Sequence, residues 1–248
     1  MIMDNYDQVS LRGAEEILNQ IKKKPDSVLG LATGGTPIGL YEKLVQSYQC
    51  GNVDLSAVTT FNLDEYLGLP AEHPQSYSYF MWKHLFSKVN IQKRNVHILP
   101  GIFDNEQKTI AHFEKKLKDC AGIDIQLLGI GTNGHIGFNE PSAHLTVGTH
   151  VVELADETVK SNSRFFNKID DVPTKAITMG MGSIMNAKKI ILLASGKSKA
   201  EAIYKTIEGR VSTDFPASFL QLHPNVKIIV DRDAASFLVG KGAHKISV

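Results

Sequence analysis

The stretch VLGLATGGTPIGLYEKLVQSY, residues Val28–Tyr48, decides the fold class. Its first five residues, Val28–Ala32, are apolar on both faces, as a buried parallel strand requires. After two glycines, Thr36 and Pro37 predict a helix that runs to Tyr48, with threonine as the N-cap and proline in the first helical position. A strand that leads through a short glycine turn into a helix is the building unit of α/β proteins.

The same alternation continues along the chain in both directions. Short apolar or β-branched runs predict further strands at Val58–Leu63, Ile123–Ile130, Ala176–Met179, Lys189–Ala194 and Val226–Val230. Helices are predicted at Ser10–Lys24, Asn105–Cys120 and Lys197–Ile207. We therefore expect a single α/β domain over residues 1–248, a three-layer α/β/α, Rossmann-like fold with a mostly parallel central sheet.

Composition excludes several classes of protein. Hydrophobic residues make up 42% and charged residues 21%, the balance of a soluble globular chain with a real core. The longest clean apolar run, Ile190–Ala194, is far too short for a membrane helix, and the acidic start MIMDNYDQ does not resemble a signal peptide. The 27 Lys+Arg and 26 Asp+Glu are interspersed, unlike the basic surface of a nucleic-acid binder. Cys50 and Cys120 are expected to be thiols in a reducing cytoplasm.

The loops that follow the predicted strands carry the polar residues of interest, since α/β folds bind ligands there. In the first loop, Gly34 and Gly35 allow close approach of a ligand, and Thr33 and Thr36 add hydroxyl donors at a helix N-terminus. This combination suits a phosphate. A tight turn with an ordinary helix cap is the open alternative, and neither a Walker loop nor a GxGxxG fingerprint is present.

A second loop, FNLDEY, places Asp64 and Glu65 at a strand end. Neighbours in an extended segment point to opposite faces, so only one carboxylate can face a site. If partly buried, that carboxylate has a raised pKa and can act as a general base. A helix cap with an acidic first turn is the alternative interpretation.

The third loop, GIGTNGHIGFNEP, holds His135 with Asn133 two residues before it and Glu140 five residues after it. A carboxylate on one ring nitrogen decides which nitrogen of the imidazole takes up a proton, and this arrangement indicates general acid–base chemistry. The spacing fits no zinc motif, so a metal site is not expected.

Two further loops, NSRFF and SGKSKA, contribute Arg164 and two lysines, Lys197 and Lys199, either of which could contact an anion. Each cation alone is typical of a solvated surface. Together with two helix N-termini they are placed to hold one anionic group.

These five motifs, from about Val28 to Val230, resemble the glucosamine-6-phosphate deaminase (glucosamine/galactosamine-6-phosphate isomerase) family. The resemblance implies conversion of glucosamine 6-phosphate and water to fructose 6-phosphate and ammonia. The 6-phosphogluconolactonases share the fold and a similar glycine–histidine loop, but they lack the NLDEY pair and the FNEP continuation. A hydrolase of that kind and a non-catalytic sugar-phosphate sensor remain as alternatives.

The resemblance also assigns roles to individual residues. It gives Asp64 the proton abstraction at C2, His135 the proton transfer of ring opening, and Glu140 the orientation of the imidazole. Many members have aspartate at position 133, so a catalytic part for Asn133 stays open. The partner is a small-molecule sugar phosphate, and neither a metal nor an organic cofactor is implied. The 6-phosphate would lie on Gly34, Gly35, Thr36, Arg164 and Lys199.

The resemblance also has implications for the assembly of the chain and for its regulation. Hexameric members that N-acetylglucosamine 6-phosphate activates carry an arginine and a lysine just after the NEP segment and a longer C-terminus. Residues 142–152 contain neither, and this chain ends at Val248, so we expect no such activation and a monomer or small homo-oligomer. The polar segment 155–172 is either a mobile lid or a surface helix.

Overall fold

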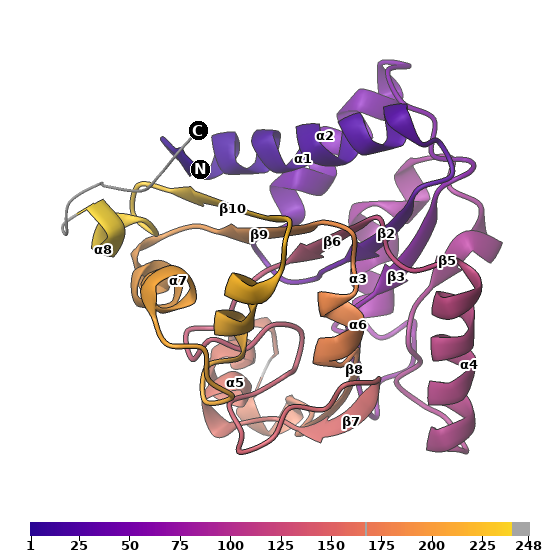
Figure 1. Ribbon diagram of the computed structural model, residues 1–248. Helices are drawn as coiled ribbons and strands as arrows, with labels where there is room; N and C mark the ends of the chain where they lie inside the picture. The colour runs from indigo at the N-terminus through magenta and orange to yellow at the C-terminus, as the bar shows by residue number, and fades with distance from the viewer. Residues whose placement is uncertain (167, 240–248) are drawn as a thin grey trace.

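The central sheet of the computed structural model is parallel and seven-stranded, in the order β1–β10–β9–β6–β2–β3–β5 (Figure 1). The structure describes residues 1–166 and 168–239. The predicted fold class is confirmed. The strands are β1 (Ile2–Met3), β2 (Val28–Leu31), β3 (Thr59–Asn62), β5 (Val96–His97), β6 (Ile125–Leu128), β9 (Ile190–Ala194) and β10 (Val226–Asp231).

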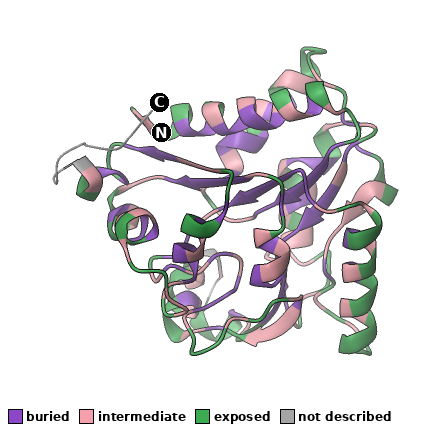
Figure 2. Ribbon diagram, in the orientation of Figure 1, coloured by how far each residue is buried: buried purple, intermediate pink, exposed green. Residues whose placement is uncertain are grey.

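Helices cover both faces of this sheet. Helices α1 and α2 lie on one face and α6 and α7 on the other, and the strands between them are the most buried part of the chain (Figures 1 and 2). No helix within the described ranges is both long and apolar enough to cross a membrane. The helices are α1 (Tyr6–Lys23), α2 (Ile38–Gln49), α3 (Tyr77–His84), α4 (Glu106–Asp119), α5 (Asp156–Asn162), α6 (Met181–Met185), α7 (Ala200–Glu208) and α8 (Ser236–Val239).

A second, antiparallel sheet of three strands corrects one prediction. It consists of β4 (Asp64–Tyr66), β8 (Lys175–Thr178) and β7 (His150–Glu153), in that order. The segment Ala176–Met179, which the sequence correctly predicts as a strand, belongs mostly to β8. It therefore lies in the small antiparallel sheet and not in the central parallel sheet. Its residues are apolar on both faces because β8 is the buried middle strand of the small sheet, not because it is parallel.

Helix α2 begins one residue later than predicted. Pro37 is the N-cap, in helical conformation, and no side chain of its own segment caps the helix. Instead, Gly39 donates its N–H to the hydroxyl of Tyr6 on α1 at 2.9 Å, and that hydroxyl lies 3.0 Å from the carbonyl oxygen of Thr36. The cap therefore comes from a neighbouring helix, which leaves the side chain of Thr36 out of the capping role.

Asp124 joins the starts of β2 and β6, the two strands that carry the glycine loops. Its backbone N–H donates to the carbonyl of Val28 at 2.8 Å, and its carboxylate accepts the Val28 N–H at 2.8 Å. Lys24 and Lys188 each donate to the same carboxylate at 2.7 Å. Burial alone would raise the pKa of Asp124, but these hydrogen bonds outweigh it and the pKa is lowered.

Asp124→Ala is expected to lower the free energy of unfolding by about 1–3 kcal/mol at pH 7, because it leaves the buried Val28 N–H unpaired. The lowered pKa stabilises the fold above the pKa of the unfolded chain, and this contribution disappears as pH falls through the folded-state pKa. The difference between wild type and variant should therefore shrink in acid. Urea unfolding at pH 7 and at pH values down to 3 measures it.

Asp119→Ala is the matched control, since that exposed carboxylate pairs only with Lys115 across one helical turn in the described contacts. It should leave the unfolding free energy unchanged. A loss in the Asp124 variant that is no larger than in this control, or that is independent of pH, would contradict the anchoring role.

Candidate functional site

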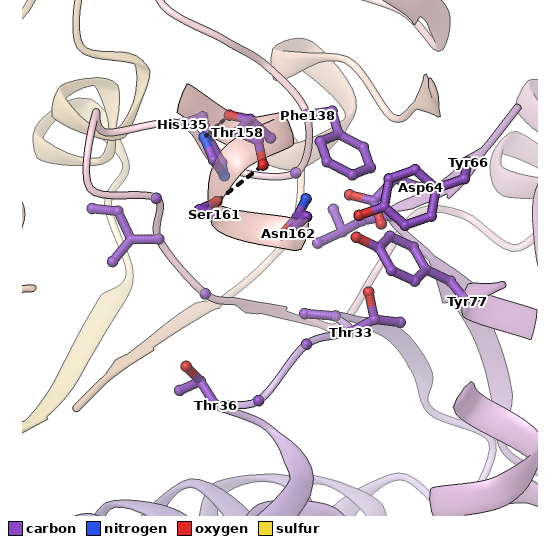
Figure 3. Close-up of a pocket in the computed structure, with 18 of the residues that line it drawn as sticks. Thr33, Thr36, Asp64, Tyr66, Tyr77, His135, Phe138, Thr158, Ser161 and Asn162 are labelled. Carbon is purple, nitrogen blue, oxygen red and sulfur yellow. Dashed lines mark hydrogen bonds between the residues drawn. The ribbon is translucent and has the colours of Figure 1, made fainter. Parts of the chain in front are cut away.

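Loops from the carboxyl ends of the central strands meet α5 and the small sheet around a pocket of about 400 Å³ (Figure 3). Parallel strands end at one edge of a sheet, so loops far apart in sequence converge there. Of the predicted site residues, all but one line this pocket. Those in its wall are Thr33, Gly34, Gly35, Thr36, Asp64, Asn133, His135, Arg164 and Lys199. Glu140 is buried beside His135.

The adjacent carboxylates of β4 have separate tasks. Because β4 is extended, Asp64 lines the pocket while Glu65 points away from it. Glu65 accepts the backbone N–H groups of Tyr77 and Ser78, each at 2.8 Å, at the start of α3. One carboxylate of the pair thus faces the site, as the sequence predicts, and the other caps a helix that begins 12 residues further along the chain.

The surroundings of Asp64 make it a weak acid. Its carboxyl is buried, with 6% of its surface exposed. Burial, followed by the nearby charge of Glu65, raises the pKa of Asp64 to about 8. Aromatic rings of Tyr66, Tyr77 and Phe138 lie beside it in Figure 3. A carboxyl with this pKa both gives up and takes up a proton near neutral pH.

His135 and Glu140 form a pair at the other side of the pocket. The Nδ1 atom of His135 lies 3.4 Å from Oε2 of Glu140. Gly131 permits this placement, because a Cβ atom on that residue would come within 2.4 Å of the His135 ring. Asn139 fixes the loop between them by donating its side-chain N–H to the carbonyl of Met179 at 2.9 Å.

Glu140 is held as a carboxylate. Burial would raise its pKa, but hydrogen bonds from His135, Thr158 and Asn133 outweigh burial and lower it. Since a carboxylate only accepts, the proton of a neutral His135 is on Nδ1, facing Glu140. This leaves Nε2 as the nitrogen that can take a proton from a ligand.

Asn133 connects this pair to the loop backbone. Its Nδ2 donates to Oε2 of Glu140 at 2.8 Å, and its Oδ1 accepts the N–H of His135 at 3.2 Å. The Asn133 side chain therefore does not act on a ligand itself. It acts on Glu140 and His135, and its N–H group is the donor that Glu140 needs. An aspartate here can do the same while the two carboxyl groups share one proton.

Asn133→Leu removes that donor, so turnover of the substrate proposed below is expected to fall about 10-fold, the effect of one lost hydrogen bond to a charged group. Asn133→Asp is expected to stay near wild type at neutral pH. Steady-state kcat of both variants measures the difference. Full activity of the leucine variant would contradict a role for the amide.

Two cations, Arg164 and Lys199, also line the pocket. The ammonium of Lys199 donates to the carbonyl oxygen of Ile130 at 2.7 Å, which fixes its position. Burial and then the charge of Arg164 lower the pKa of Lys199, while Glu157 opposes this. Two like charges held close enough to disfavour each other form a site that an anion would stabilise.

The sequence analysis missed several residues of the wall. Tyr66 could have been found, because it follows Asp64 at the two-residue period of a strand and so shares its face. Three others gave no comparable signal, since they come from α3 and α5, whose positions depend on tertiary contacts. These are Tyr77, Thr158 and Ser161.

Known proteins are similar to this chain along nearly its whole length. Residues 4–229 match the family model described as glucosamine-6-phosphate isomerases/6-phosphogluconolactonase. The chain is 52% identical over 248 residues to the glucosamine-6-phosphate deaminase of Thermoanaerobacter pseudethanolicus, covering all of this chain and 98% of that one. It is 56% identical over 238 residues to the glucosamine-6-phosphate deaminase of Clostridium tetani, covering 96% and 99%.

Solved structures extend the comparison to the fold. A monomeric glucosamine-6-phosphate deaminase superposes with a TM-score of 0.93 at 46% identity, over 96% of this chain and 98% of that one. The 6-phosphogluconolactonase of Leishmania guyanensis superposes with a TM-score of 0.73 at 24% identity, over 99% and 98%, a likeness of fold alone.

Proposed function

The chain belongs to the family of glucosamine-6-phosphate isomerases and 6-phosphogluconolactonases, and from this premise we propose that it converts glucosamine 6-phosphate and water to fructose 6-phosphate and ammonia. One observation carries the proposal. A single pocket is lined by a carboxyl of raised pKa, by a histidine that pairs with a buried carboxylate behind it, and by two cations. These are the groups that an isomerising deaminase needs at the two ends of a sugar phosphate.

The first step is opening of the closed aminosugar ring. The Nε2 atom of His135 takes the proton of the anomeric hydroxyl and returns it to the ring oxygen as the C1–O5 bond breaks. Glu140 stabilises the imidazolium that forms between these transfers, because its carboxylate lies 3.4 Å from Nδ1. The product is the open-chain aldehyde.

The second step moves a proton from C2 to C1. The carboxylate of Asp64 removes the C2 proton while O1 takes up a proton from solvent, which leaves a neutral enolamine. Asp64 then returns its proton to C1, which gives an iminium at C2. Water adds to C2 and loses a proton, the nitrogen takes up a proton and leaves as ammonia, and loss of the remaining hydroxyl proton gives the ketose. We propose that Asp64 and His135 carry the transfers at carbon and at the ring oxygen, and that neither a metal nor an organic cofactor takes part.

The phosphate supplies the binding energy that positions the reacting carbons. The loop Thr33–Thr36 and the cations Arg164 and Lys199 are in the same pocket as Asp64 and His135. A dianion there would relieve the repulsion between the two cations and hold C1 and C2 in reach of the acid–base groups.

A coupled assay on the purified protein tests the proposal. Glucosamine 6-phosphate should yield ammonia and fructose 6-phosphate in equal amounts. Glucosamine without the phosphate should react far more slowly, since it lacks the anchor. Acid release from 6-phosphogluconolactone would instead identify the hydrolase, and tight binding of glucosamine 6-phosphate without any turnover would identify a sensor.

Two further proposals concern assembly and α5. The chain is proposed to act as a monomer or small homo-oligomer without activation by N-acetylglucosamine 6-phosphate, because residues 142–152 lack arginine and lysine. A sigmoidal rate curve that this compound sharpens would oppose it.

Segment 155–172 is proposed to be a lid, because it contributes residues to the pocket wall; residue 167 lies outside the described part of the chain. Unchanged protease sensitivity on adding substrate would oppose that proposal.

A further inference from the structure

We infer that Thr158 on α5 is a positioning residue, whose hydroxyl holds Glu140 and His135 in the relative orientation that ring opening requires. The inference rests on the proposed function. Thr158 is buried, with 2% of its surface exposed, yet its side chain is polar and reaches the pocket wall. It belongs neither to the glycine loop nor to any of the five motifs.

The hydroxyl of Thr158 bridges the two members of the pair. It donates to Oε1 of Glu140 at 2.5 Å. The same oxygen lies 3.4 Å from Nδ1 of His135, a contact drawn in Figure 3. A hydroxyl has one proton, and a carboxylate can only accept it. The lone pairs of Thr158 therefore face Nδ1, and they fit a histidine that carries its proton there.

Thr158 is the partner that controls the second carboxylate oxygen. Asn133 and His135 both contact Oε2 of Glu140, and both come from the same loop as Glu140. Among the described contacts, only Thr158 holds Oε1. Without it, rotation of the carboxylate about its last bond would move Oε2 off the line to Nδ1. The proton on Nδ1 would then lose its acceptor. The imidazole could place its proton on either nitrogen, and Nε2 would no longer be fixed as the nitrogen that takes the proton from the ligand.

Helix α5 therefore completes the pair from outside the loop. Thr158 lies 18 residues beyond Glu140, and the adjacent Glu157 accepts a hydrogen bond from Thr132 at 2.8 Å. These two contacts attach α5 to both ends of the histidine loop. The orientation of the imidazole thus depends on the docking of α5, and not on the loop alone.

Thr158→Val keeps the shape of the side chain and removes the hydroxyl. We expect kcat for glucosamine 6-phosphate to fall about 10- to 100-fold, as for loss of one charge-assisted hydrogen bond, with KM changed less than about 3-fold. Thr158→Ser keeps the hydroxyl and should restore most of kcat. Thr206→Val is the matched control, a buried threonine whose hydroxyl bonds the carbonyl of Ala202 within α7. It should leave kcat unchanged.

The pH dependence of kcat distinguishes a positioning role of the Thr158 hydroxyl from a role in packing alone. The groups that act on Glu140 are the His135 imidazole and Asn133 amide from its own loop and the Thr158 hydroxyl from α5. Loss of one donor raises the pKa of the carboxyl. The limb that Glu140 sets lies at lower pH than that of Asp64, because the pKa of Glu140 is lowered and that of Asp64 is raised. The Glu140 limb of kcat should therefore move to higher pH in Thr158→Val, whereas it should stay in place in Thr206→Val.

Nitrogen-15 NMR of the imidazole gives a readout that needs no turnover. Wild type is expected to show His135 with its proton on Nδ1, and Thr158→Val a mixture of tautomers. Should the valine variant fail to fold, the alanine variant replaces it. Wild-type kcat and an unmoved Glu140 limb in the valine variant would overturn the inference while the proposed function stands. Absence of ammonia release by wild type would overturn both.

Discussion

Asp64→Asn is expected to lower kcat for glucosamine 6-phosphate by about 10²- to 10⁴-fold, the contribution of a positioned general base. The amide has nearly the same size as the carboxyl but cannot take the C2 proton. Exchange of the C2 hydrogen with deuterated solvent should disappear along with ammonia release. Binding of inorganic phosphate should persist, because the cationic part of the pocket is unchanged.

The pH dependence of the wild type follows from the same carboxyl. Burial and the Glu65 charge raise the pKa of Asp64 to about 8, so the base is protonated over most of the neutral range. The value of kcat/KM should fall as pH drops below about 8 and level off above it, because only the carboxylate accepts the proton. The residual activity of Asp64→Asn should lack this limb.

A buried carboxylate at the far end of the sheet is the matched control. Asp124→Asn removes a charge that is 4% exposed, similar to Asp64 at 6%, but that lies at the starts of β2 and β6. It should reduce stability and leave kcat near wild type. Retained turnover in Asp64→Asn, or an equal loss of kcat in the control, would remove Asp64 from the mechanism.

The parts of the site that were predictable are those encoded locally. The loop after β2 contains two glycines and two threonines in sequence, and the loop after β6 contains His135 within a run of glycines. Parallel strands bring their ends together whatever lies between them, so these loops had to meet once the α/β fold was recognised. The predicted placement of one β4 carboxylate needed only the two-residue period of a strand.

The parts that could not be predicted depend on contacts between distant segments. The first turn of α3 is held by Glu65 in addition to its own N-cap Ser76, and that of α2 by the hydroxyl of Tyr6, so the contacts from Glu65 and Tyr6 cannot be read from the helices themselves. The antiparallel sheet exists because β4 pairs with β8 across more than a hundred residues. Thr158 looks like any threonine in a polar helix until α5 is seen beside Glu140.

His135→Gln is the second substitution with a large expected effect. Glutamine can still donate a hydrogen bond to Glu140, but it cannot take up and release a proton, so ring opening loses its acid–base group. We expect kcat with the closed sugar to fall about 10²- to 10³-fold. His144→Gln is the control, because His144 is exposed and lies outside the pocket wall. It should retain wild-type kcat.

Comparing the closed sugar with an open-chain analogue shows which step of the reaction each variant impairs. With an analogue locked in the open-chain form, the first step is not required, and the deficit of His135→Gln should shrink to within about 10-fold of wild type. Asp64→Asn should remain equally impaired on both forms, since proton abstraction at C2 follows ring opening. An equal deficit of His135→Gln on the closed and the open substrate would contradict the ring-opening role. A deficit that shrinks for His135→Gln and persists for Asp64→Asn would place the step of His135 before that of Asp64 in the reaction.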